Sequence, residues 1–130
     1  IRDCTYGILC LQQASALRFQ NCQFFDNAGF SMIGLLNCQR INFTHCLIYD
    51  NRVDLIQGVP PIGDDYLFNV MNSEEITVQH CHLHHNQVTY LAPFPDAIQL
   101  FETRMADNAF GPDTLYPRDR DYQAHPLCPV

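Results

Sequence analysis

Acidic side chains recur at a regular interval in this sequence and form the first candidate site. They are Asp3, Asp26, Asp50 and Asp107, with His85 in the corresponding place of one copy. Such a row would hold calcium, since hard cations take several carboxylate oxygens, or would contact sugar hydroxyls. Asp-Asn is also good turn chemistry, so a purely structural explanation stays open.

A row of ring side chains lies directly beside these acids. Phe25, Tyr49 and His84 each precede a member of the acidic row. Aromatic faces flanked by carboxylates suit sugar rings, so the expected partner is a polysaccharide or glycan surface. Ordinary cross-strand packing of aromatics would explain the same row. The candidate ligand-binding residues are therefore Phe25, Asp26, Tyr49, Asp50, His84 and Asp107.

Histidines form a third candidate site. His80, His82, His84 and His85 fall within six residues. His45, His80 and Glu102 occupy equivalent places in three successive copies of a repeat, and two imidazoles beside a carboxylate would suit a transition metal. A solvated surface is the alternative, because corner positions commonly carry polar residues for backbone reasons alone.

A repeated phrase sets the spacing of all three groups. Its copies occupy residues 17–27, 41–51, 76–86 and 98–108, at steps of 24, 35 and 22 residues. Self-similarity at this period is the signature of a solenoid, in which each repeat buries its apolar face against its neighbours.

The pattern inside each copy predicts strands and corners. In the first copy, Leu17 and Phe19 lie two residues apart, as do Cys22 and Phe24, which is the strand period. The three-residue step from Phe19 to Cys22 predicts a corner, and the closing Asn27 is expected to adopt a left-handed turn. With a third strand upstream, the sequence predicts an all-β, right-handed parallel β-helix of about four to five coils and three short parallel sheets.

The repeat also predicts the domain organisation. Coils are expected over residues 1–108, with an insertion at 52–65 and an irregular capping loop or tail at 109–130. Ile1 falls on the buried column without a strand before it, so we expect a truncated N-terminus. Open coil ends would favour end-to-end association or a partner chain that caps them.

Composition excludes two classes of partner. The net charge of −7 disfavours nucleic acid, whose backbone requires a basic stripe. No run of about 18 apolar residues is present, so no membrane span is expected.

The seven cysteines divide into two sets. Cys22, Cys46 and Cys81 repeat with the coils, so we expect them to face inward as packed, reduced thiols. Stacked side chains about 4.8 Å apart have parallel Cβ vectors, which suit a disulfide poorly. The disulfide pairing of the other four stays open. The sequence contains no C-x-x-C pair, so nothing indicates a zinc site. These others are Cys4, Cys10, Cys38 and Cys128.

The phrase, close to I-x-F-x-N-C-x-I-x-x-N, resembles the repeats of the pectate-lyase-like superfamily of parallel β-helices over residues 1–108. That superfamily includes lyases, hydrolases, epimerases, phage tail proteins and non-catalytic modules. The resemblance implies a secreted or cell-surface module directed at carbohydrate, with polysaccharide binding favoured over cleavage. A non-enzymatic structural or adhesion spacer is the first alternative.

A narrower resemblance gives a second alternative. Residues 63–85 are similar to the polygalacturonase pattern, which would make Asp64 and Asp65 the catalytic acids and His85 their neighbouring histidine. Carboxylates held apart to admit water are the inverting geometry of glycoside hydrolysis. The chain departs from that pattern, because the upstream Asn-x-Asp and the glycines around the histidine are missing.

Overall fold

The computed structural model describes residues 1–4, 8–29, 31–53, 66–88 and 90–109. Nearly every regular element in these ranges is a short strand. The strands are β1 (Leu9–Gln12), β2 (Ser15–Gln20), β3 (Gln23–Phe25), β4 (Ala28–Gly29), β5 (Ser31–Leu36), β6 (Gln39–Thr44), β7 (Leu47–Tyr49), β8 (Arg52–Val53), β9 (Tyr66–Met71), β10 (Glu74–Gln79), β11 (His82–His84), β12 (Gln99–Phe101) and β13 (Arg104–Ala106), and the 3-10 helix η1 covers Pro95–Ala97.

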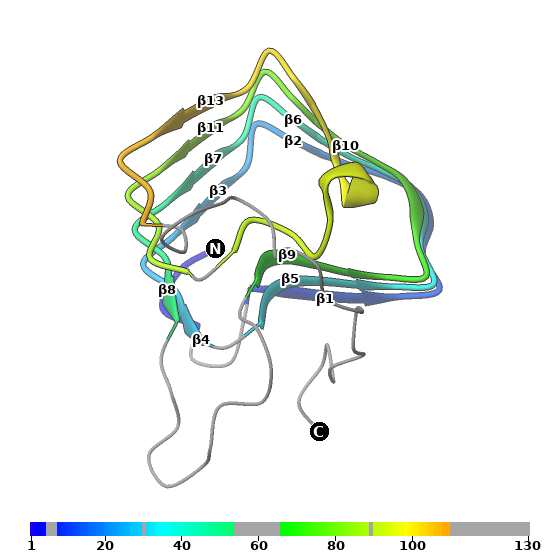
Figure 1. The fold of residues 1–130 in the computed structure, drawn as a ribbon, viewed down its shortest axis with the longest axis horizontal. Helices are drawn as coiled ribbons and strands as arrows, with labels where there is room; N and C mark the ends of the chain where they lie inside the picture. Colours follow the sequence, from blue (N-terminus) through cyan, green and yellow to red (C-terminus); the bar gives the residue numbers. More distant parts are fainter. Residues whose placement is uncertain (5–7, 30, 54–65, 89, 110–130) are drawn as a thin grey trace, which may run out of the picture.

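Strands of successive coils pair in parallel, and the sheets form the sides of a stack. The sheet orders are β1-β5-β9, β12-β10-β6-β2, β13-β11-β7-β3 and β4-β8. Figure 1 looks along the stack, so that each coil lies over the next and three long sides enclose the interior. The fold is a right-handed parallel β-helix, which confirms the predicted class. The two-stranded β4-β8 sheet was not predicted.

The observed register matches the register read from the repeats. Leu17 pairs with Ile41, and Ile41 pairs with Ile76. Arg2 bridges to Phe25, which aligns the first residues with the end of the next coil as predicted. Most of the expected insertion, residues 54–65, lies outside the described residues. The same holds for residues 110–130 of the expected tail.

Left-handed backbone conformations turn the chain at the corners. The predicted corner residues Asn21, His45, His80 and Glu102 all have positive φ, between 44° and 57°. Non-glycine residues enter this region at a cost, and asparagine and aspartate enter it most easily. The acidic row occupies a second such corner, with φ between 54° and 62°, at Asp3, Asp26, Asp50, His85 and Asp107.

The closing asparagines do not adopt the predicted left-handed turn. The residue before each takes the positive φ, and the asparagine itself points inward; Asn51 is 0% exposed. Its Nδ2 donates to Phe24 O (3.1 Å) and Asn86 Oδ1 (2.9 Å), while its Oδ1 accepts from Asn27 Nδ2 (3.0 Å). An asparagine ladder therefore joins the coils, because a buried backbone carbonyl needs a donor. Its members are Asn27, Asn51, Asn86 and Asn108.

Stacked rings fill the interior. Phe19 and Phe43 stack at 5.0 Å between ring centroids, and Phe24 and Phe68 meet Phe43 edge-on at 6.3 Å and 5.7 Å. These side chains belong to one continuous core that runs through the coils. Burial of large apolar side chains is the dominant favourable contribution to folding, so this core holds the coils together.

Small hydrogen-bonding side chains line the inner side of the corner that follows β2, β6, β10 and β12. Cys46 Sγ lies 3.3 Å from Phe19 O and 3.4 Å from Thr44 O. Thr103 Oγ1 makes the same two kinds of contact in the same column, two coils further along the stack, to Val78 O and Phe101 O. The inward stacking predicted for the cysteine column is confirmed for Cys46 and Cys81, which are both buried free thiols.

Candidate functional site

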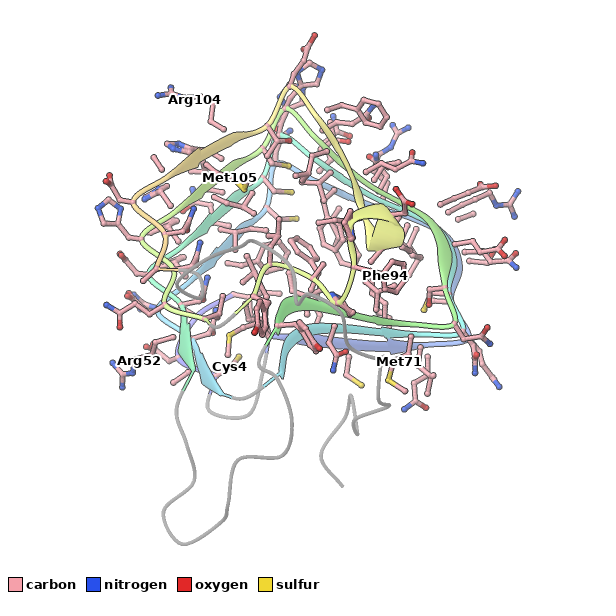
Figure 2. The ribbon with its side chains drawn as sticks, in the orientation of Figure 1. Cys4, Arg52, Met71, Phe94, Arg104 and Met105 are labelled. Carbon is pink, nitrogen blue, oxygen red and sulfur yellow. The ribbon has the colours of Figure 1, made fainter. Side chains whose placement is uncertain are left out.

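The outer face of the β13-β11-β7-β3 sheet carries the predicted ligand-binding residues. In each of these three-residue strands the middle side chain is part of the inward column, and the two flanking side chains belong to outward columns. Figure 2 shows this alternation on β13, where Arg104 points away from the stack and Met105 lies toward the interior. The alternation follows from the strand period of two.

The predicted ring row forms a continuous column on this face. Phe25 and Tyr49 stack at 5.0 Å with an interplanar angle of 2°, and Tyr49 and His84 stack at 4.9 Å and 6°. The guanidinium carbon of Arg2 lies 6.0 Å from the Phe25 ring centroid. The faces of Tyr49 are therefore covered by its neighbours, so this ring presents its edge and its hydroxyl. The expectation that its face accepts a sugar ring does not fit this geometry.

The acidic row lies at the next corner, beside the ring column. Its members sit one coil apart in positive-φ positions. His85 Nε2 lies 3.8 Å from Asp107 Oδ2, and both side chains are exposed. Within the described residues no three histidine, cysteine or acidic side chains group as a metal site would require. The row presents single carboxylates to solvent, which suits hydrogen bonding to hydroxyl groups better than calcium chelation.

The histidine corner brings its three predicted residues side by side. His45 and His80 stack at 5.0 Å with an interplanar angle of 10°, and His80 Nδ1 lies 2.9 Å from Glu102 Oε2. Parallel stacking places one imidazole face against the other, so their nitrogen lone pairs, which lie in the ring planes, do not converge. The described part of the chain offers no grouping of three ligands here either. Metal binding at this corner stays a prediction that the geometry does not favour.

A corner groove of about 480 Å³ lies between the histidine corner and the outer face. We use this name for the depression lined by His45, Cys46, Leu47, His80, Cys81, His82, Glu102 and Arg104. Sequence reasoning did not single out Leu47 or Arg104, whose place beside His82 follows only from the strand register.

His82 brings a buried polar atom to this groove. Its Nε2 is buried and has no hydrogen-bond partner among the described residues. Burial, followed by the charges of His84, Arg104 and His85, lowers the pKa of the His82 imidazole below its ordinary value. A buried nitrogen without a partner costs free energy unless a bound group satisfies it.

The neighbouring histidines form a hydrogen-bonded pair. His84 Nδ1 and His85 Nδ1 are 2.9 Å apart, so one ring donates and the other accepts. The two rings meet edge-on at 88°, with His84 in the ring column and His85 in the acidic row. This contact links the two rows on the third coil.

The cysteine column has a structural role in the described residues. Burial raises the pKa of Cys22, and the hydrogen bond with Cys81, followed by burial, raises the pKa of Cys46. A raised pKa keeps a thiol protonated and unreactive at neutral pH. The third member differs, because the hydrogen bond with Cys46 lowers the pKa of Cys81 to about 7. All three thiols lie at one corner of the stack, where Cys46 and Cys81 are buried.

Of the three residues that resemble the polygalacturonase pattern, His85 alone lies within the described residues. Asp64 and Asp65 lie outside the described residues, while His85 takes part in the acidic row. Hydrolysis at Asp64 and Asp65 stays a prediction. Loss of activity in Asp64→Asn without loss of fold would support it.

Comparison with known proteins agrees with the fold. A family model described as a right handed beta helix region matches residues 1–108. Searches of curated proteins and of solved structures gave no match. Among the described residues no helix is long and apolar enough to cross a membrane.

Proposed function

Because the chain belongs to the right-handed β-helix family over residues 1–108, we propose that it is a non-catalytic module that binds a polysaccharide along the outer face of β3, β7, β11 and β13. One observation carries this proposal. The ring column of Phe25, Tyr49 and His84 runs straight along the stack at a spacing of 5.0 Å and 4.9 Å. The acidic row follows it residue by residue, so two successive coils offer an aromatic ring beside a carboxylate, Phe25 with Asp26 and Tyr49 with Asp50, and the next coil offers His84 with His85.

The mode of contact follows from the ring geometry. Ring edges supply apolar contact, and the Asp26 and Asp50 carboxylates accept hydrogen bonds from sugar hydroxyls. The Tyr49 hydroxyl donates to Gln23 Oε1 at 3.3 Å and accepts from a sugar hydroxyl. Each such hydrogen bond contributes only about 0.5–1.5 kcal/mol net, so affinity for a single sugar is low. An extended chain that spans several coils gains from repeated contacts. In this proposal the module acts as a secreted or cell-surface protein.

A glycan-array screen of the chain, with and without a chelator, tests the proposal. We expect selective binding to an extended glycan, weakened at least about tenfold by Tyr49→Ala or Asp50→Asn. Glu74→Gln is the matched control, because Glu74 is an exposed acid on β10 in a different sheet. Loss of binding in chelator would assign calcium a place in the acidic row. Equal loss in Glu74→Gln would count against this face.

A structural or adhesion spacer is the second candidate. Two observations favour it. Neighbouring rings cover both faces of the Tyr49 ring. The positive φ of 54° at position 50 is reason enough for an aspartate there, without a role in binding. This function predicts a blank glycan array from folded protein and outer columns that tolerate substitution. Association of modules end to end, or with a chain that caps the coils, belongs to this candidate and would be seen by sedimentation.

A further inference from the structure

The corner groove is lined by a cation, Arg104, that lacks an ionic partner in the part of the chain that the structure describes. Arg104 forms no ion pair with any residue in the described ranges of the chain, and Figure 2 shows it pointing away from the stack. The groove's single carboxylate, Glu102, is already paired with His80 at 2.9 Å. Arg104 lines the groove, and no described residue occupies its guanidinium donors.

A buried nitrogen without a described partner lies on the adjacent strand. His82 is the register neighbour of Arg104 on the adjacent coil, and its buried Nε2 has no partner. Adjacent strands lie about 4.8 Å apart, so one small group can contact both side chains. Side-chain rotamer changes on binding are common, and a small shift in the groove would uncover Nε2.

We infer that the corner groove binds an oxyanion, a carboxylate, sulfate or phosphate group, through Arg104 and His82. The guanidinium fork matches the paired oxygens of such groups, and charge-assisted hydrogen bonds of this kind are about twice as strong as neutral ones. A neutral imidazole with its proton on Nε2 donates the remaining hydrogen bond. The inference does not depend on polysaccharide binding at the ring column, although the groove adjoins that column: the ring centroids of His82 and His84 are 4.5 Å apart.

The donor set of the groove favours an oxyanion over the neighbouring alternatives. A metal ion requires several converging ligands, and the described residues contain no group of three. A neutral sugar would leave the Arg104 charge without a counterion. Leu47 adds one apolar surface, which suits the carbon attached to a carboxylate.

Titration with sodium acetate, sulfate and phosphate at constant ionic strength tests the inference. The readout is the nitrogen and proton shifts of the His82 ring by NMR, with calorimetry for affinity. We expect a saturable shift of the His82 signals by at least one of these anions. Tightest binding of acetate would assign the site to carboxylates, and tightest binding of phosphate or sulfate would assign it to those groups.

Two variants separate specific binding from general charge. Arg104→Gln is expected to weaken anion binding at least about tenfold. Arg18→Gln is the matched control, since Arg18 is an exposed arginine on β2 in another sheet, and is expected to bind as the wild type does. His82 signals that do not saturate, or an equal loss in both variants, would overturn the inference.

Discussion

At the scale of single residues, backbone conformation explains the residue types of the acidic row and of the histidine corner. Asp50 has φ of 54° and His45 has the same value at the neighbouring corner. The sequence predicted a corner at His45, because polar residues that tolerate unusual backbone angles recur there. The sequence-based prediction placed the left-handed turn at Asn51, whereas the structure has it at Asp50. Aspartate and asparagine both favour turns, and only the structure shows that Asn51 is the one that faces inward.

Substitution of Asp50 tests this account of the corners. Asp50→Val is expected to lower the free energy of unfolding by about 1–2 kcal/mol, because a β-branched residue is strained at positive φ. Asp50→Gly is expected to lower it by much less. Urea denaturation of both variants checks this, and an equal effect of the two would contradict it.

The asparagine ladder gives a second prediction. Asn51→Ala removes hydrogen bonds to Phe24 O, Asn86 and Asn27 and leaves their buried groups unsatisfied. We expect a loss of about 3 kcal/mol in the free energy of unfolding. Gln99→Ala, on an exposed position of β12, is the control and should change stability little. A loss below about 1 kcal/mol in Asn51→Ala would show that water satisfies these groups.

His82 predicts a dependence of stability on pH. Its pKa in the folded protein is lowered by burial and by neighbouring charges, so the unfolded chain takes up this proton more readily. Its contribution to the free energy of unfolding is therefore present above its ordinary pKa and is lost as the pH falls below that value. Between about pH 8 and about pH 5, the wild type should lose more stability than His82→Gln. Parallel pH profiles for the two proteins would refute this.

At the scale of strands, apolar residues two apart were enough to locate the three long sides of the coil. The short pair β4 and β8 was missed because Ala28–Gly29 and Arg52–Val53 show no alternation. The outward face of β11 was recognised from its histidines. The groove beside it was not, because Leu47 and Arg104 come together only through pairing across coils.

Phe43 tests the packing between sheets. Its ring is fully buried and contacts Phe19, Phe24 and Phe68. Phe43→Ala is expected to cost about 3–5 kcal/mol of unfolding free energy. Phe25→Ala, on the outer face, should cost much less, and calorimetric unfolding of the two variants distinguishes them. Similar losses would mean that the outer column supports the fold as strongly as the core does.

At the scale of the whole molecule, the repeat made the architecture predictable, since each coil contacts only its neighbours. The binding chemistry was less predictable. Residue spacing places Phe25, Tyr49 and His84 in one column, but it does not reveal that the rings cover one another's faces. The same limit applies to His45 and His80. Their residue types suit a metal ion, but their rings stack, so the ring nitrogens do not converge on one point.

Mapping a bound oligosaccharide by two-dimensional amide NMR tests the central claim most directly. The ligand is the best binder from the glycan screen, added to the whole chain in solution. We predict saturable shifts confined to β3, β7 and β11 and to the acidic row, centred on Tyr49, Asp50 and His84. Shifts centred on another sheet, or no saturable shift with any glycan, would contradict the claim that this outer face is the binding surface.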